Sequence, residues 1–303
     1  MLQNITEEYK GKWASILQQE GIDPKYFSGR HTPCPMPGCG GTDRSRWIAE
    51  TETLFCSVCG AKRDITIYMR WTGLSFKESA AKIRNTKINY QKQVVKQKKN
   101  PMLLLKRVHS KLKKTVGGDV VDTYLNYRGI TKRPRDVLTG TNMPYYGGSG
   151  LDGQKVAGVY DCMVSRITDV DGNLESYHLV YLTPLGEKIS NAQAKIILPP
   201  LNTITGCSSK ASNAGKVLAI AEGIETALYV DEDEGVPCWS GISANGMEKI
   251  KIPEIVETVY IYADHDKSYT GQAAAYNLAK RLSASGIEVK VFIPETVGTD
   301  WLG

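Results

Sequence analysis

Residues 258–295 read TVYIYADHDKSYTGQAAAYNLAKRLSASGIEVKVFIPE, and this stretch indicates the fold class of the C-terminal part. A short apolar run is followed by a segment with apolar residues at helical spacing, and then by a second apolar run. The preceding sequence has the same rhythm, with KVLAIAEG at 216–223, IETALYVDEDEG at 224–235 and VPCWSG at 236–241. Strands that alternate with helices are typical of a parallel sheet. We therefore predict an α/β domain over residues 214–303.

Acidic residues stand where the apolar runs of this domain stop. Glu222 ends VLAIAEG, and Asp264 and Asp266 end VYIYADHD. The carboxyl ends of parallel strands face the ligand, and residues two apart in a strand end project to the same side. Mg²⁺ prefers oxygen ligands and keeps several waters, so a few convergent carboxylates suffice to hold it. We predict a site for Mg²⁺ or Mn²⁺ here, with His265 as a bystander that points the other way.

Four of the seven cysteines lie within residues 31–64, HTPCPMPGCGGTDRSRWIAETETLFCSVCGAKRD. They form a Cys-x4-Cys pair and a Cys-x2-Cys pair, each followed by glycine: Cys34, Cys39, Cys56 and Cys59. This is the spacing of a zinc ribbon, and four thiolates around one Zn²⁺ make a closed, structural site. Because the first pair is wide, His31 is an alternative ligand in place of Cys39.

Basic residues are concentrated in the N-terminal third of the chain. Residues 1–100 contain 17 basic residues (lysine and arginine) and 9 acidic residues (aspartate and glutamate). The corresponding numbers are 14 and 9 over residues 101–213, and 7 and 14 over residues 214–303. An excess of basic residues in the N-terminal third favours a polyanionic partner.

Within the ribbon, Arg44, Arg46 and Trp47 combine charge with an aromatic face, as proteins that bind single-stranded nucleic acid do. The alternative is that Trp47 belongs to the core and the arginines are merely solvated. We favour nucleic-acid binding.

The chain is predicted to have four parts. Residues 1–85 carry the ribbon and a helical segment at 64–84, and residues 86–100 form a lysine-rich linker. Residues 101–213 combine a helical start with alternating strands, including a hairpin at Asp171–Gly172, and indicate a mixed α+β subdomain. The α/β domain follows. Because no signal peptide or long apolar run is present, we expect a cytoplasmic protein with no membrane partner.

Three C-terminal segments together resemble the toprim domain, a Rossmann-like fold, of bacterial-type and phage primases: AIAEGIETALYV, YIYADHDKSYTGQAAAYNLAKRL and GTDWLG. Glu222 matches the glutamate of that family, Asp264 and Asp266 match its D-x-D pair, and Asp300 matches its final acidic motif. The ribbon, with CGGTDRSR, is similar to the zinc-binding domain of primases from phages and mobile elements. YLNYRGI and GNLESYHLVYL are similar to the segment before toprim. The wide first cysteine pair and Leu179, where a basic residue is expected, depart from the pattern.

The resemblance implies a DNA primase of phage, plasmid or mobile-element replication. Such an enzyme makes short RNA primers on single-stranded DNA from ribonucleoside triphosphates, beside a replicative helicase. Asp264, Asp266 and Asp300 would hold two metal ions, with Glu222 as a ligand or a proton-handling residue. Basic residues would neutralise the triphosphate or the template, and the candidates are Arg128, Lys195 and Lys216.

Two alternatives stay open. One is a toprim nuclease or topoisomerase-like enzyme, although such nucleases lack the ribbon and type IA topoisomerases need a tyrosine in a large additional domain. The other is a non-catalytic single-stranded-DNA-binding accessory of replication, against which the intact set of Glu222, Asp264 and Asp266 argues.

Overall fold

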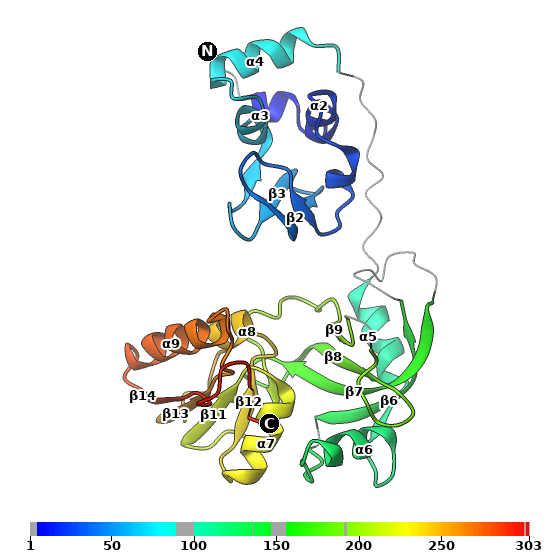
Figure 1. Cartoon of the computed structure of the whole chain (residues 1–303), viewed down its shortest axis with the longest axis vertical. Coiled ribbons are helices and arrows are strands. Elements are labelled where there is room, and N and C mark those ends of the chain that lie inside the picture. Colours follow the sequence, from blue (N-terminus) through cyan, green and yellow to red (C-terminus); the bar gives the residue numbers. More distant parts are fainter. Residues whose placement is uncertain are drawn as a thin grey trace. The chain divides into compact units, whose positions relative to one another are not determined.

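The computed structural model shows two compact units, Met1–Gln97 and Lys98–Gly303 (Figure 1). The structure describes residues 5–88, 100–134, 136–146, 156–190, 193–299 and 301–302. Most of the expected linker, residues 89–99, lies outside the described residues. The finer division into four parts stays a prediction.

The first unit combines an antiparallel sheet with short helices. Its sheet has the order β1-β2-β3-β4. The strands are β1 (Thr32–Cys34), β2 (Gly40–Ile48), β3 (Thr53–Cys56) and β4 (Lys62–Arg63). The helices are α1 (Ile5–Glu8), α2 (Trp13–Gln19), the 3₁₀ helix η1 (Pro24–Phe27), α3 (Asp64–Thr72) and α4 (Phe76–Asn85). The predicted helical segment 64–84 forms two helices, because Gly73 ends α3 in the left-handed conformation and the Ser75–Glu78 capping box starts α4.

One hydrophobic core joins the helices and the sheet of this unit. Trp13 and Leu17 of α2, Tyr68 of α3 and Trp47 of β2 are buried in the same cluster. The Trp47 ring packs edge-on against Phe27, with 5.1 Å between ring centroids. The ribbon therefore shares its core with the helices.

The second unit begins with an antiparallel sheet of order β5-β6-β7-β8-β9. Its strands are β5 (Leu112–Lys114), β6 (Val137–Tyr145), β7 (Gly158–Thr168), β8 (Leu174–Leu182) and β9 (Lys195–Ile197). Two helices accompany it, α5 (Pro101–His109) and α6 (Val120–Tyr127). The predicted hairpin joins β7 to β8, and Gly172 in its turn has a φ of +89°. The mixed α+β character expected for this segment is confirmed.

The parallel sheet predicted from the sequence is present, in the order β10-β12-β11-β13-β14. Its strands are β10 (Ser209–Lys210), β11 (Val217–Ala221), β12 (Cys238–Ser240), β13 (Thr258–Tyr262) and β14 (Glu288–Phe292). The helices are α7 (Ile224–Asp233), α8 (Ala244–Lys249) and α9 (Thr270–Ser283). All neighbouring strands are parallel except β10, which runs antiparallel to β12. Ala221 pairs with Tyr262, so β11 and β13 end level with each other.

Both faces of the parallel sheet are covered, with α7 and α9 on opposite sides (Figure 1). Leu278 and Leu282 of α9 pack with Ile220 and Ile261 on one face. On the other face, α7 shares a core with α6 and with the strands β7 and β8. The two sheets of this unit are therefore fastened through α6 and α7. Among the described residues, no helix has the length and apolar character needed to cross a lipid bilayer.

Candidate active site and zinc site

Three carboxylates lie at the carboxyl edge of the parallel sheet. Glu222 follows the last residue of β11, and Asp264 and Asp266 follow the end of β13 on the adjacent strand. Distances measured from Gly271, in the first turn of α9, show how close the three residues are to one another. A Cβ built there would lie 3.3 Å from Glu222 Oε2, 3.2 Å from Asp266 Oδ2 and 3.2 Å from the Asp264 carbonyl oxygen. The three predicted acidic residues are therefore neighbours around this glycine.

Asp266 is held by the start of α9. Its Oδ2 accepts a hydrogen bond from the Gly271 N–H at 3.1 Å, and its carbonyl accepts one from Gln272 Nε2 at 3.0 Å. These two hydrogen bonds fix the position of Asp266 at this edge.

Glu222 has an electrostatically unfavourable environment. Burial raises the pKa of its carboxyl group, and the charges of Asp264 and Asp266 raise it further. Its Oε2 is buried and accepts no hydrogen bond from the described residues. Its carbonyl oxygen, in contrast, accepts a hydrogen bond from Ser240 Oγ at 2.8 Å. A buried carboxylate oxygen without a donor, beside two further acids, fits a divalent cation.

The acidic edge is more open than a closed metal cage. Among the described residues, only the four cysteines form a group of candidate ligands whose ligating atoms all lie within 4.8 Å of one another. Mg²⁺ keeps several bound waters and is often coordinated by one or two carboxylates together with phosphate oxygens of a substrate, so the protein need not enclose it. The donors at this edge suit an ion that binds together with a phosphorylated substrate.

The raised pKa of Glu222 predicts a pH effect on stability. The folded protein holds the Glu222 proton more tightly than the unfolded chain does, and this stabilises the folded state at a pH below the pKa of the unfolded chain. This stabilisation is lost as the pH rises through the raised pKa of the folded state. Without added divalent cation, Glu222→Gln should melt like the parent at pH 4.5 but about 2–4 °C higher at pH 8. Millimolar Mg²⁺ should close this gap. Calorimetry at both pH values measures it, and equal melting temperatures at pH 8 would show that Glu222 carries no strain.

His265 points away from the acidic edge. Its Nδ1 lies 2.7 Å from the Pro294 carbonyl oxygen, to which it donates. Its backbone N–H donates to Thr299 and its carbonyl accepts from Gly298. The expectation that His265 is a bystander agrees with this geometry.

The C-terminal segment binds the end of β13. Trp301 Nε1 donates a hydrogen bond to the Ala263 carbonyl oxygen at 3.1 Å. The Trp301 ring packs edge-on against the Tyr262 ring, with 5.0 Å between the ring centroids. Asp300 itself lies outside the described residues, and its role as a metal ligand stays a prediction.

The cysteine cluster has the dimensions of a zinc site. Cys34 Sγ lies 3.6 Å from Cys59 Sγ, and Cys39 Sγ lies 3.7 Å from Cys56 Sγ. Four sulfurs at about 2.3 Å from a tetrahedral Zn²⁺ are about 3.8 Å apart, so the cluster fits this ion. With four sulfur ligands, the site has no open position for catalysis.

Backbone amides prepare one of these thiols for metal binding. The N–H groups of Val58 and Cys59 donate to Cys56 Sγ at 3.4 and 3.5 Å. Burial acts to raise the pKa of the Cys56 thiol, but these amide donors outweigh it and lower the pKa to about 6. The alternative ligand, His31, is exposed, and its Nδ1 bonds to the Asp43 carbonyl at 2.8 Å. All four cysteines are in place without it.

The expectation that Trp47 stacks against a base is wrong. Its side chain is 2% exposed and belongs to the core of the first unit, so it cannot reach a ligand without unpacking that core. The alternative assignment of Trp47 to the core is correct. Arg46 does face solvent, and Phe55 lies directly opposite it on β3, 45% exposed. Phe55 was missed, although its position next to inward-pointing Cys56 indicates that it faces outward.

The three basic candidates of the second unit are in different environments. Lys216 precedes β11 whereas Glu222 follows it, so they lie at opposite ends of a strand about 16 Å long. Lys216 forms an exposed ion pair with Glu257 at 2.8 Å, so it does not lie beside Glu222, and its contact with nucleic acid stays a prediction. Arg128 ends α6, and its role stays a prediction. Lys195 forms an ion pair with Glu225, a buried residue that sequence reasoning also missed.

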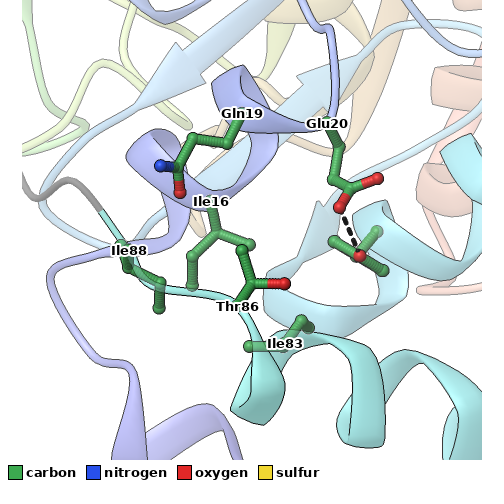
Figure 2. A pocket seen from close by; sticks show the side chains of 7 residues that line it. Ile16, Gln19, Glu20, Ile83, Thr86 and Ile88 are labelled. Atoms are coloured by element: carbon green, nitrogen blue, oxygen red, sulfur yellow. Dashed lines mark hydrogen bonds between the residues drawn. The ribbon is translucent and has the colours of Figure 1, made fainter.

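Among the described residues, two further hollows of the first unit are considered for ligand binding. Figure 2 shows the smaller one, between α2 and the end of α4, where Glu20 accepts a hydrogen bond from Tyr68. Its volume of about 10 Å³ is enough for one water and too small for a ligand. The larger one is open and polar, with a volume of about 460 Å³, and is lined by Lys25, Ser28, Arg30, His31 and Thr32. Its basic side chains lie close to β1 of the ribbon.

Comparison with known proteins identifies the C-terminal domain. Residues 217–302 match the family model of the Toprim domain, and residues 104–205 match that of a domain of unknown function. The toprim resemblance is thereby confirmed, and the α/β sheet that carries Glu222, Asp264 and Asp266 is a toprim domain.

Several solved primase structures are similar to this chain. The zinc-binding and RNA polymerase domains of the Aquifex aeolicus primase are 15% identical, with a TM-score of 0.39 over 99% of this chain and 81% of that one. A DNA primase domain from Pseudomonas aeruginosa is 14% identical, with a TM-score of 0.45 over 67% and 73%. The primase fragment of the bacteriophage T7 primase-helicase protein is 17% identical, with a TM-score of 0.38 over 88% and 91%.

Proposed function

We propose that this chain, whose residues 217–302 form a toprim domain, is a DNA primase that makes short RNA primers on single-stranded DNA. The observation that carries the proposal is the meeting of Glu222, Asp264 and Asp266 around Gly271, at the carboxyl edge of that domain. The four-cysteine ribbon in the same chain supports a template-binding role for the first unit. Its setting would be phage, plasmid or mobile-element replication in the cytoplasm, with a replicative helicase as partner.

The acidic residues have two kinds of role in the proposed reaction, metal binding and proton transfer. Asp264 and Asp266 would hold Mg²⁺ or Mn²⁺, which supplies charge stabilisation to the attacking and leaving oxygens of nucleotidyl transfer. Asp266, anchored to α9, orients this end of the site. Glu222, with its raised pKa, is suited either to complete the ligand set or to accept the proton of the attacking 3′-hydroxyl. Asp300 would complete the acidic set.

The outer face of the ribbon supports single-strand binding. Arg46 and Phe55 are direct neighbours across β2 and β3, so they share one face of the sheet. A guanidinium beside an exposed aromatic ring can pair with a backbone phosphate while a base stacks on the ring. Arg44, two residues before Arg46, belongs to the same face of β2.

Binding of single-stranded DNA should therefore depend on Phe55 and Arg46. We expect Phe55→Ala to weaken binding about tenfold at every salt concentration, because one stacked base is worth about 1–3 kcal/mol. Arg46→Ala should weaken binding at low salt and reduce the salt slope by about 0.7, as for the loss of one phosphate contact. Fluorescence anisotropy with a labelled oligonucleotide measures both.

A matched control is Phe76→Ala, which removes another half-exposed phenylalanine of the same unit, at the start of α4. It should bind like the parent. If Phe55→Ala also binds like the parent, or if Phe76→Ala loses as much affinity, the ribbon face is not the template reader.

Primer synthesis separates this proposal from its alternatives. The chain is incubated with single-stranded DNA, ribonucleoside triphosphates and Mg²⁺ or Mn²⁺, with and without a helicase. A primase yields RNA complementary to the template. Cleavage of the DNA instead would indicate a toprim nuclease or topoisomerase-like enzyme, and binding with neither reaction would indicate a replication accessory.

A further inference from the structure

An exposed tyrosine follows Asp266 by three residues, at the start of α9. We infer that Tyr269 is a nucleobase-binding residue, whose ring stacks against the base of a ribonucleotide held at Asp264 and Asp266. This inference rests on the proposed function, because that function places a nucleotide and its metal ion at these carboxylates. It adds a contact to the base, which the acidic residues do not provide.

The ring of Tyr269 takes little part in the packing of the domain. The residue is 65% exposed. Within the described part of the chain, its hydroxyl has no hydrogen-bond partner and its ring has no aromatic or cationic neighbour. A large aromatic ring in water buries its apolar area only when another molecule covers it. The fold therefore gains little from a tyrosine here, whereas a planar ligand gains a stacking surface.

The backbone of Tyr269 is also unusual for a tyrosine. Its φ of +58° lies in the left-handed region, which is unfavourable for most residues other than glycine and asparagine. Tyr269 occupies the N-cap position of α9, where serine, threonine, aspartate or asparagine is preferred, and its side chain makes no capping hydrogen bond. Neither the turn nor the helix start explains this residue, so the explanation must come from the exposed ring.

The position of Tyr269 indicates what its ring contacts. Its N–H donates to the Asp266 carbonyl at 3.1 Å, and its carbonyl accepts from the Ala273 N–H at 3.0 Å. Gly271, around which the three carboxylates meet, is two residues further along the chain. The backbone that carries the ring is therefore fixed beside the acidic edge. In a nucleotide only the ribose separates the α-phosphate from the base, so a nucleotide held at this edge has its base close by.

The chemistry of stacking suits the proposed reaction. Every base has a π-face, and stacking on an aromatic ring tolerates any base. An enzyme that copies a template must accept all four ribonucleotides at one site. A tyrosine ring therefore orients the base without selecting it, and selection is left to pairing with the template.

The test compares nucleotide affinity among variants of the full chain. Isothermal titration calorimetry with Mg²⁺ measures the dissociation constants of ATP and of inorganic triphosphate, which lacks the base. We expect Tyr269→Leu to weaken ATP binding about tenfold, as for the loss of one base–aromatic stack. Tyr269→Phe keeps the ring and should bind ATP like the parent. Inorganic triphosphate should bind equally to all three proteins.

Tyr276→Leu is the matched control. Tyr276 is 58% exposed on the same helix, seven residues further on. It therefore lies on the same face of α9 but about 10 Å further from the acidic edge. This variant should keep parental affinity for ATP.

Tyr269→Gly separates binding from folding. Glycine adopts a positive φ without steric cost, and the lost ring is exposed, so this variant should melt no lower than the parent. It should nevertheless bind ATP as weakly as Tyr269→Leu. Affinity for single-stranded DNA should stay parental in every variant, because the ring is assigned to the nucleotide and not to the template.

Four results would overturn the inference: no binding of ATP by the parent, parental ATP affinity in Tyr269→Leu, equal losses in Tyr269→Leu and Tyr276→Leu, or a loss confined to single-stranded DNA. A parent that binds ATP through Tyr269 but makes no RNA would instead contradict the proposed function alone.

Discussion

Asp264→Asn and Asp266→Asn should each reduce primer synthesis by roughly 10³-fold, because several kcal/mol of charge stabilisation are lost with the metal ligand. Asparagine keeps the shape of each side chain, and at position 266 it keeps an oxygen that can accept from the Gly271 N–H. The fold, the zinc content and the affinity for single-stranded DNA should therefore stay parental. Labelled ribonucleotide incorporation on a single-stranded template measures the loss.

Asp171→Asn provides the control for this pair, because Asp171 is an exposed aspartate of the hairpin between β7 and β8 and is not one of the acidic residues that follow β11 and β13. It should synthesise primers at the parental rate. Parental synthesis by both Asp264→Asn and Asp266→Asn would contradict the catalytic assignment of the acidic edge.

Cys56→Ser should abolish zinc binding and unfold the whole first unit, while the second unit stays folded. Structural Zn²⁺ contributes about 10–16 kcal/mol in small zinc domains, which exceeds the stability of an ordinary domain. From the sequence alone we expect unfolding to stop at residues 30–62. The shared core of Trp13, Trp47 and Tyr68 extends it to the helices. Metal analysis and hydrogen exchange over residues 5–88 and 100–302 measure both effects.

His31→Ala tests the alternative ligand set. Because His31 is exposed and bonds to a backbone carbonyl, this variant should keep one zinc per chain and a protected first unit. Loss of zinc in His31→Ala, or full protection of residues 5–88 in Cys56→Ser, would show that the four cysteines are not the structural site.

The acidic edge could be predicted from the sequence because the information is local. Apolar runs define the strands, and Glu222, Asp264 and Asp266 stand where these runs stop. In a parallel sheet all such ends meet at one edge, so no knowledge of long-range packing is needed. The zinc site could also be predicted from the sequence, because zinc binding constrains the spacing of its four cysteine ligands.

The remaining site features depend on contacts between distant segments. Trp47 and Phe55 both lie in strands, and only the packing of Phe27 against Trp47 shows which face is covered. Glu225 looks like an ordinary helix residue until the fold brings Lys188 and Lys195 to it from another sheet. Periodicity predicts which residues share a face, but not which face another element covers.

We propose that the toprim domain of this chain makes RNA on a DNA template, and a primer-synthesis assay measures this activity. The full chain with Zn²⁺ is given single-stranded oligonucleotides that differ in sequence, labelled ribonucleoside triphosphates, Mg²⁺ or Mn²⁺, and a helicase. We expect short alkali-labile products whose sequence follows the template and which are absent with Asp264→Asn. A parent that makes no such product with either metal ion, or the same product from Asp264→Asn, would contradict the proposed primase activity.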